Sequence, residues 1–237
     1  MELLKGIEAI DLALYLRAQR VLVVSDFHLG FEESLNKRGV FVPRFQVKDV
    51  LQRLTAIFEK VSPKTIVING DLKHEFGRIS EQEWRDVLKL IDVLKKQCEE
   101  LVIIKGNHDT ILKPIAEKRL IALVPEFRAG TIIVVHGDKL QDMPKDVKTI
   151  IIGHEHPAVA LREKGRVEKF KCFLRGKYAG KNLIVQPSFN PVVEGTDVLK
   201  ERVLSPYVKH LEDCDVFVVN DKTQKILSFG KIKNILS

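Results

Sequence analysis

Short apolar runs alternate with amphipathic segments along the first two thirds of the chain. Five runs are rich in β-branched side chains and predict strands at residues 20–25, 65–68, 101–104, 131–135 and 149–152. Continuous apolar runs of this length are typical of strands that are buried on both faces of a sheet. The pattern therefore predicts a largely buried sheet rather than one with a solvated face.

Two segments between these runs have the spacing of amphipathic helices. Apolar residues recur at i, i+3, i+4 and i+7 over residues 47–61 and again over residues 84–94. Ser80 precedes the second segment, and Glu83 comes three positions after Ser80, which is the pattern of a capping box. Strands that alternate with helices of this kind predict an α/β fold.

The pattern changes to β after about residue 157. Further strands are predicted at residues 158–162, 167–174, 183–186, 216–219 and 226–229, with turn residues between them. No repeat, low-complexity stretch or long linker divides the chain. We therefore predict one domain over residues 1–237, in which one sheet packs on another and helices lie outside.

Composition and charge narrow the class of protein only a little. The formal net charge of +7 permits an anionic partner such as nucleic acid, but a lysine-, arginine- and glutamate-rich surface is equally typical of thermophilic proteins. No apolar run approaches the roughly 20 residues that span a bilayer. The first residues lack the order of a signal peptide. We expect a cytoplasmic protein without a membrane partner.

Polar residues with metal-binding side chains follow the predicted strands. Six of the seven histidines lie in five short motifs: Asp26-Phe27-His28, Gly70-Asp71-Leu72-Lys73-His74, Gly106-Asn107-His108-Asp109, His136-Gly137-Asp138 and Gly153-His154-Glu155-His156. The carboxyl ends of strands are where α/β proteins place their ligands. Five such turns in one chain indicate one shared site.

The donor types in these motifs indicate the metal and its chemistry. Carboxylate, carboxamide and imidazole groups suit Mn, Fe, Zn or Mg, and no cysteine lies in the motifs. Seven candidate donors are too many for one tetrahedral ion but fit two ions that share a carboxylate. Two ions about 3.5–4 Å apart hold a phosphate and activate a water molecule. That chemistry suits the hydrolysis of phosphate esters.

The ordered motifs resemble those of the calcineurin-like metallophosphoesterases. The resemblance implies a four-layer αββα sandwich with two packed mixed sheets flanked by helices. It implies that one ion is held by Asp26, His28, His156 and a bridging Asp71, and that the other is held by Asp71, Asn107, His136 and His154. It further implies that His108 contacts the scissile phosphate and protonates or stabilises the leaving oxygen, and that Asp109 orients His108.

His74 points to one branch of this superfamily. The sequence Gly-Asp-x-x-His is similar to that of the nuclease subunit of the double-strand-break-repair complex and of small prokaryotic phosphoesterases associated with a DNA ligase and a helicase. The resemblance implies that His74 positions the substrate. The alternative for His74 is a polar turn residue without a catalytic role.

A basic β-hairpin at about residues 157–182 offers a second feature for nucleic-acid binding. Its cations are Arg162, Lys164, Arg166, Lys169, Lys171, Arg175, Lys177 and Lys181, with Phe170, Phe173 and Tyr178 between them. Such a hairpin is able to follow a phosphate backbone and stack bases. The alternative is a solvated hairpin whose aromatic residues pack into the core. The segment 186–191 resembles the turn that closes the site in this superfamily, which would place Ser188 or Asn190 beside it; the alternative is a plain turn between two prolines.

The sequence thus predicts a dinuclear-metal-dependent phosphoesterase that acts on phosphodiesters, with nucleic acid as a plausible substrate. Mn²⁺ is the favoured ion, with Fe, Zn or Mg as alternatives. A homodimer is an expectation taken from the nuclease relatives. Two alternatives stay open, namely a small-molecule phosphodiesterase or phosphomonoesterase, and a non-catalytic metal-binding scaffold. The scaffold relatives generally lack the histidine that acts on the leaving group, whereas this chain has His108.

Overall fold

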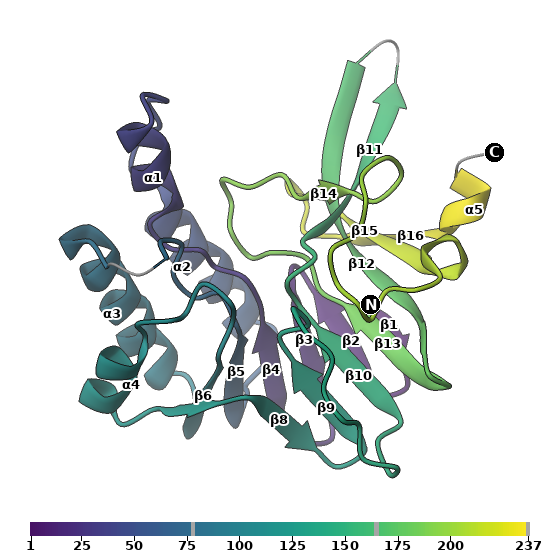
Figure 1. Cartoon of the computed structure of the whole chain (residues 1–237), viewed down its shortest axis with the longest axis horizontal. Coiled ribbons are helices and arrows are strands. Elements are labelled where there is room, and N and C mark those ends of the chain that lie inside the picture. The colour runs from purple at the N-terminus through teal and green to yellow at the C-terminus, as the bar shows by residue number, and fades with distance from the viewer. Residues whose placement is uncertain (77–78, 164–165, 236–237) are drawn as a thin grey trace.

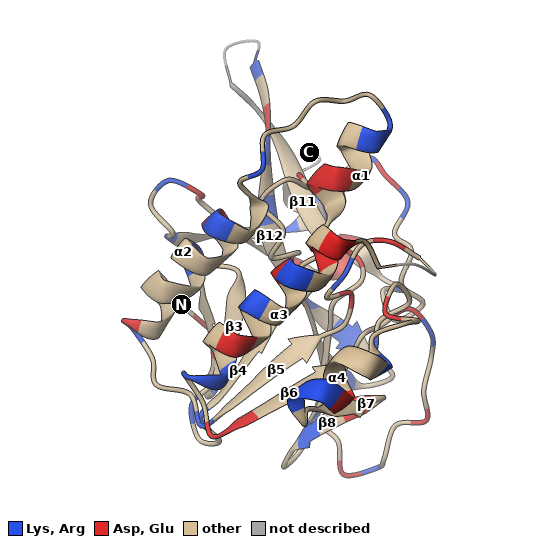
Figure 2. Cartoon of the chain, turned by 90° about the vertical axis from the view of Figure 1, so that its left-hand side faces the viewer, with Lys and Arg blue, Asp and Glu red and all other residues tan. Residues whose placement is uncertain are grey.

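Two β-sheets pack face to face in the computed structural model, which describes residues 1–76, 79–163 and 166–235. The helices α1 (Phe31–Lys37), α2 (Gln46–Phe58), α3 (Glu81–Lys95) and α4 (Lys113–Arg119) lie on the outer side of the first sheet (Figure 1). This arrangement confirms the predicted fold class. Basic and acidic residues are interspersed along these helices (Figure 2). Among the described residues, no helix has both the length and the apolar character needed to cross a membrane.

The first sheet carries three of the five motifs. Its strands, in spatial order, are β1 (Glu2–Leu4), β2 (Ile7–Ile10), β3 (Ala13–Leu16), β4 (Val21–Val24), β5 (Thr65–Asn69), β6 (Glu100–Ile104) and β7 (Ala122–Val124). The strands from β4 to β7 are parallel, whereas β1 to β4 pair antiparallel. Because β4, β5 and β6 are parallel neighbours, their carboxyl ends meet at one edge.

The second sheet carries the other two motifs. Its strands are β8 (Glu126–Ala129), β9 (Ile132–Val135), β10 (Thr149–Ile152), β11 (Pro157–Glu163), β12 (Arg166–Tyr178), β13 (Lys181–Val185), β14 (Thr196–Asp197), β15 (Asp215–Val219) and β16 (Ile226–Lys231). The spatial order is β14-β11-β12-β13-β10-β9-β8, and β15 pairs with β12 and β16. β9, β10 and β13 are parallel, so the motifs after β9 and β10 also emerge at one edge.

Successive residues of the second sheet face two different cores. Val134, Ile151 and Ile184 belong to the core between the sheets, which also holds residues of β4, β5 and β6. Their neighbours Ile133 and Ile150 face the other side, where they pack beneath residues 198–214 and α5 (Ile232–Ile235). Burial on both faces explains the unbroken apolar runs. The shared core supports our proposal that residues 1–237 form one domain.

The outer cover of the second sheet contains little regular structure. Two short helices, η1 (Leu211–Asp213) and α5, accompany a long segment without regular hydrogen bonding. Tyr207 is fully buried in this cover, and its hydroxyl accepts a hydrogen bond from the amide of Gln141. The fourth layer is therefore built mainly from irregular chain.

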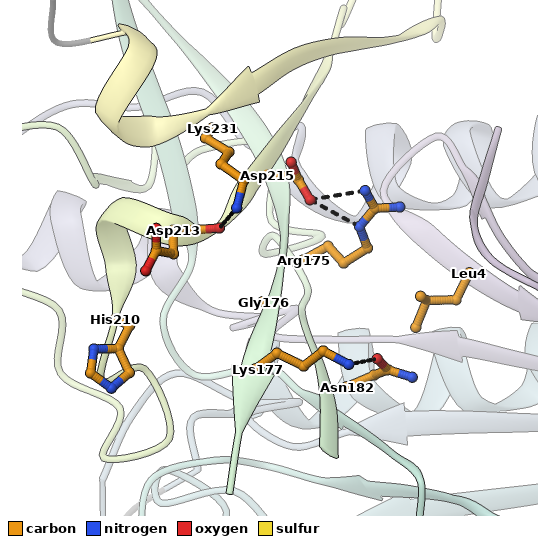
Figure 3. Close-up of a pocket in the computed structure, with 9 residues that line it drawn as sticks. All are labelled: Leu4, Arg175, Gly176, Lys177, Asn182, His210, Asp213, Asp215 and Lys231. Atoms are coloured by element: carbon orange, nitrogen blue, oxygen red, sulfur yellow. Dashed lines mark hydrogen bonds and ion pairs between the residues drawn. The ribbon is translucent and has the colours of Figure 1, made fainter. Parts of the chain in front are cut away.

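The predicted hairpin exists, but its basic residues do not form one free surface. Lys171 is 6% exposed, and its ammonium donates to the carbonyl oxygens of Ser188 and Asn190. Arg175 pairs with Asp215 at 2.8 Å beside a cavity of about 550 Å³ (Figure 3). Lys171 fits the alternative interpretation of the hairpin, because its side chain is directed into the protein and away from any phosphate backbone.

Other parts of the hairpin fit the alternative interpretation. Phe173 is fully buried between the sheets, and Tyr178 packs on Tyr207 with ring centroids 4.9 Å apart. Lys164 lies outside the described residues. Phe173 and Tyr178 lie on opposite faces of β12 and pack against the two different cores, as the alternation of side chains along a strand requires.

Candidate dinuclear metal site

All five motifs converge where the parallel strands of the two sheets have their carboxyl ends. Asp26 and His28 follow β4, Asp71 follows β5, Asn107 and His108 follow β6, His136 follows β9, and His154 and His156 follow β10. Hydrogen bonds join the turns of the first sheet, since the amide of His28 donates to the carbonyl of Asp71 at 2.9 Å. The amide of His154, from the second sheet, donates to the Asp26 carboxylate at 3.1 Å. The sheets are thus connected through the site itself.

One group of donors consists of Asp26, His28 and His156. Their ligand atoms lie within 4.8 Å of one another. His28 Nε2 is 3.2 Å from His156 Nε2, and His156 Nε2 is 3.4 Å from Asp26 Oδ1. These are three of the four residues that the resemblance assigns to one ion.

The other group consists of Asp71, His136 and His154, again with ligand atoms within 4.8 Å. His136 Nε2 lies 3.4 Å from Asp71 Oδ2 and 3.0 Å from Asn107 Oδ1. Asn107 therefore adjoins this group. The arrangement brings together the four residues that the resemblance assigns to the second ion.

Asp71 lies between the two groups. Its Oδ2 atom is 3.6 Å from His28 Nε2 in one group and 3.4 Å from His136 Nε2 in the other. A shared carboxylate of this kind is the feature that two ions in one site require. With oxygen and nitrogen donors on both sides and no thiolate, the residues fit two divalent ions of the Mn, Fe or Zn type.

The turns hold five of these residues in a strained backbone conformation. The φ angles are positive at Asp26 (55), His28 (42), Asp71 (47), His154 (64) and His156 (50). Each such residue costs on the order of 1–2 kcal/mol, and strain of this kind collects at functional sites where the surrounding structure enforces it. These left-handed turns direct polar side chains that are close in sequence into one small space.

Gly70 and Gly106 leave room for the donors. A Cβ atom at Gly70 would lie 2.1 Å from His136 Nδ1, and one at Gly106 would lie 2.2 Å from Asp71 Oδ1. Any other residue at these two positions would displace a donor. The glycines of the two motifs therefore have a steric role beyond the turn itself.

Burial and mutual charge set the protonation of the donors. Burial lowers the pKa of His28 to about 3, with a further contribution from the charge of His156. Burial also lowers the pKa of His136, but the hydrogen bond to Asp71 and the charge of Asp26 outweigh it and raise the pKa to about 9. Burial raises the pKa of Asp71, yet His136 brings it well below its usual range. Asp71 is thus ionised, and His28 is in the neutral form that binds metal.

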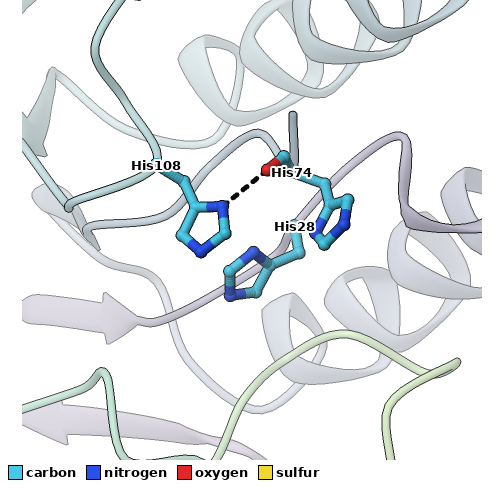
Figure 4. A group of neighbouring side chains, drawn as sticks. All are labelled: His28, His74 and His108. Carbon is cyan, nitrogen blue, oxygen red and sulfur yellow. Dashed lines mark hydrogen bonds between the residues drawn. The ribbon is translucent and has the colours of Figure 1, made fainter. Parts of the chain in front are cut away.

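His108 lies beside the bridging carboxylate. Its amide donates to Asp71 Oδ1 at 2.8 Å, and its Nε2 is 3.9 Å from Asp71 Oδ2. Its Nδ1 is 2.5 Å from the carbonyl oxygen of His74 (Figure 4). The resemblance implies that Asp109 orients this ring, but here the partner of the ring nitrogen is a main-chain carbonyl.

Asp109 instead ties two motifs together. Its carboxylate accepts hydrogen bonds from the amides of Leu72 at 3.1 Å, Lys73 at 3.4 Å and Gly106 at 3.0 Å. The side chain is 1% exposed. Asp109 therefore fixes the position of the His108 turn relative to the Asp71 turn through the backbone.

His74 and Glu83 complete this side of the site. The ring of His74 packs near those of His28 and His108, with centroid distances of 5.6 and 5.5 Å. Burial and the charge of His108 lower its pKa to about 4. The amides of His74 and Glu75 donate to Glu83 Oε1 at 2.9 and 3.1 Å.

Glu83 is a supporting residue that the sequence did not reveal. The predicted cap is present, because Ser80 Oγ accepts from the amide of Glu83 at 3.0 Å. The carboxylate of Glu83, however, supports the His74 turn. The capping-box pattern drew attention to Glu83 in the sequence, but it indicated a role at the N-terminus of α3 rather than at the site.

The segment 186–190 supports the Asp26 turn from the second sheet. Ser188 Oγ donates to the carbonyl of Asp26 at 2.7 Å, and the amide of Phe189 donates to the carbonyl of Ser25 at 2.9 Å. Phe189 packs on Phe27, with ring centroids 5.1 Å apart. Ser188 thus lies beside the site, as the sequence predicted.

Several solved structures are similar to this chain. The nuclease MPE of Pseudomonas putida has a similar structure, with a TM-score of 0.64 and 18% sequence identity over 94% of each chain. YfcE, a phosphoesterase from E. coli, matches with a TM-score of 0.42 and 12% identity over 89% of this chain and 98% of that one. A double mutant of Vps29 from Entamoeba histolytica matches with a TM-score of 0.38 and 14% identity over the same shares.

Sequence comparison identifies the family. No curated protein sequence gives a significant match. The profile of the calcineurin-like phosphoesterases matches residues 19–171, which include all five motifs. The chain therefore belongs to the calcineurin-like phosphoesterase family.

Proposed function

We propose that this protein hydrolyses phosphodiesters at a site that holds two divalent metal ions, with Mn²⁺ as the favoured ion. The observation that carries the proposal is the position of Asp71, whose carboxylate adjoins both donor groups. When bound, two ions supply a positively charged clamp for the phosphate and an activated water molecule. The family is one of phosphoesterases, which supports the reaction class.

The side chains around the ions have distinct roles in this proposal. Asp26, His28 and His156 hold one ion, while Asn107, His136 and His154 hold the other, and Asp71 is shared. His108 presents Nε2 toward the site, where it hydrogen-bonds the phosphate and protonates the leaving oxygen. His74 positions the substrate, and Asp109 and Glu83 keep the two turns in place.

A nucleic-acid substrate is supported by the Gly-Asp-x-x-His motif and by a structural neighbour that is described as a nuclease. A small-molecule phosphodiester is the second candidate, because Lys171 and Arg175 of the hairpin are engaged within the protein. Lys171, which is buried, is not free to follow a phosphate backbone. Only the substrate differs between the two candidates.

The test compares substrates with one metal preparation. The metal-stripped protein is restored with Mn²⁺ and assayed with bis(p-nitrophenyl) phosphate, p-nitrophenyl phosphate and single-stranded DNA, beside His108→Ala. We expect Mn²⁺-dependent cleavage of the diester that His108→Ala abolishes. Cleavage of DNA as well would favour a nuclease, whereas an intact DNA strand would favour a small-molecule substrate. Turnover of the monoester alone would contradict the proposal.

A further inference from the structure

Phe76 is an exposed aromatic residue beside the proposed acid. It follows the Gly-Asp-x-x-His motif by two positions, and 60% of its surface is exposed. Its ring lies against the ring of His108, with centroids 3.8 Å apart and an angle of 34° between the planes. One part of the Phe76 ring is therefore held by His108, while the remainder faces solvent.

Packing alone does not account for this position. Exposing the greater part of a phenylalanine leaves apolar area in water, which is unfavourable relative to burying it. A single exposed apolar side chain on a surface needs no explanation. Phe76, however, belongs to a continuous set of rings at the site, since His108 stacks near His74, and His74 contacts Phe31 edge-on with centroids 4.7 Å apart.

The distances relate this ring to the reacting group. His108 Nε2 is 3.9 Å from the bridging carboxylate, and in the proposed function it faces the leaving oxygen. A nucleobase is attached one sugar away from that oxygen, and Phe76 is an exposed aromatic side chain in contact with His108. Bases stack on exposed aromatic side chains with little dependence on sequence, and each stacked base contributes about 1–3 kcal/mol.

We propose that the exposed surface of Phe76 is the stacking platform for a nucleobase next to the scissile phosphate. The inference rests on the proposed function and narrows its substrate class to nucleotide-containing phosphodiesters. Phe76 then determines specificity, whereas His108 acts on the phosphate. The base contributes through binding, so its loss raises KM more than it lowers kcat.

The test uses dithymidine monophosphate and two analogues in which one or the other nucleoside is replaced by an abasic tetrahydrofuran unit. These analogues remove one base and leave the alkyl oxygens chemically similar. The variants are Phe76→Ala, Phe76→Trp and the control Phe229→Ala, which removes an exposed phenylalanine from the edge strand β16. A thermal melt of each variant verifies that it folds.

We expect Phe76→Ala to lower kcat/KM for dithymidine monophosphate roughly 5- to 100-fold, mainly through KM. For one of the two abasic analogues, Phe76→Ala should lower kcat/KM by no more than about twofold. Phe76→Trp should retain activity on dithymidine monophosphate, and Phe229→Ala should behave as the wild type. Equal losses on all three substrates would overturn the inference, because Phe76 would then act only by orienting His108.

The inference and the proposed function fail in different ways. Wild-type protein that cleaves bis(p-nitrophenyl) phosphate but not dithymidine monophosphate would overturn the inference and leave the proposed function intact. The same holds if dithymidine monophosphate and both abasic analogues are cleaved equally well. Failure to cleave any diester, including bis(p-nitrophenyl) phosphate, would overturn the proposed function and the inference with it.

Discussion

The ring nitrogen Nδ1 of His108 lies 2.5 Å from the main-chain carbonyl oxygen of His74. Because a carbonyl oxygen only accepts hydrogen bonds, Nδ1 carries the proton, and Nε2 is the nitrogen that faces the site. The His74 turn is itself fixed by Glu83. Two motifs that are more than thirty residues apart thus fix the orientation of the His108 ring, and its acid form is the imidazolium, which carries a second proton on Nε2.

Replacement of His108 separates metal binding from turnover. His108 lies outside the two donor groups around Asp26 and Asp71, so we expect His108→Ala to bind two ions as the wild type does. Loss of a general acid typically lowers kcat by about 10²- to 10⁴-fold. Metal content by mass spectrometry and diesterase kinetics measure the two effects. A variant that loses one ion, or keeps full activity, would contradict the role given to His108.

Replacement of Asp109 tests the link between the turns. Asp109→Ala leaves three buried amides without their acceptor, so we expect the free energy of unfolding to fall by about 2–4 kcal/mol. Asp109→Asn keeps one acceptor oxygen and should lose less. Urea denaturation of the metal-free proteins measures both. The account of Asp109 fails if Asp109→Ala unfolds within about 0.5 kcal/mol of the wild type.

Two glycines with nearly equal φ angles form a matched pair. In Gly70→Ala the new Cβ meets His136 Nδ1 at 2.1 Å, whereas the Cβ in Gly180→Ala meets nothing within 4 Å. Both substitutions strain the backbone, at φ values of 78 and 76. Only Gly70→Ala should weaken Mn²⁺ binding, by about 10-fold or more, measured by calorimetric titration. Equal affinities in the two variants would show that His136 adapts to the added methyl group.

The burial of Lys171 should make the free energy of unfolding depend on pH. Burial and the charge of Arg53 lower the pKa of Lys171 to about 7 from an ordinary value of 10.5. Between these values the unfolded chain holds a proton that the folded protein lacks, so stability rises with pH across this window and the gain is absent below pH 7.

The expected gain between pH 7.5 and 9.5 is roughly 1–3 kcal/mol relative to Lys171→Met, which has no titrating group at this position. Urea denaturation at both pH values measures the difference. Parallel pH dependence in the two proteins would show that the folded state keeps Lys171 charged. The two carbonyl acceptors at Ser188 and Asn190 are satisfied by either protonation state of the amine.

The sequence contained the information for the central strands and for the convergence of the motifs. The predicted strand at residues 149–152 coincides with β10, and β4, β5, β6 and β9 differ from the predictions by one residue at one or both ends. Their apolar runs are unbroken because both faces of each strand are buried. The convergence of the motifs followed from the parallel pairing of these strands.

Other features depended on contacts between distant segments and had no local signal. The strands β1, β2 and β3 are only three or four residues long, which is too short to give a clear pattern, so they were not predicted. Lys171 has the sequence context of a surface cation, and only its contacts with the segment 188–190 show that it is buried. The carboxylates of Glu83 and Asp109 likewise bind the backbone of other turns.

The most direct test of the central claim is a titration of the metal-stripped protein with Mn²⁺ in which bound metal and diester hydrolysis are measured in the same samples. Because Asp71 adjoins both donor groups, we predict that binding saturates at two ions per chain and that hydrolysis of bis(p-nitrophenyl) phosphate appears as the second ion binds. Full activity with one bound ion, or two bound ions without hydrolysis, would contradict the proposal of a dinuclear phosphodiesterase.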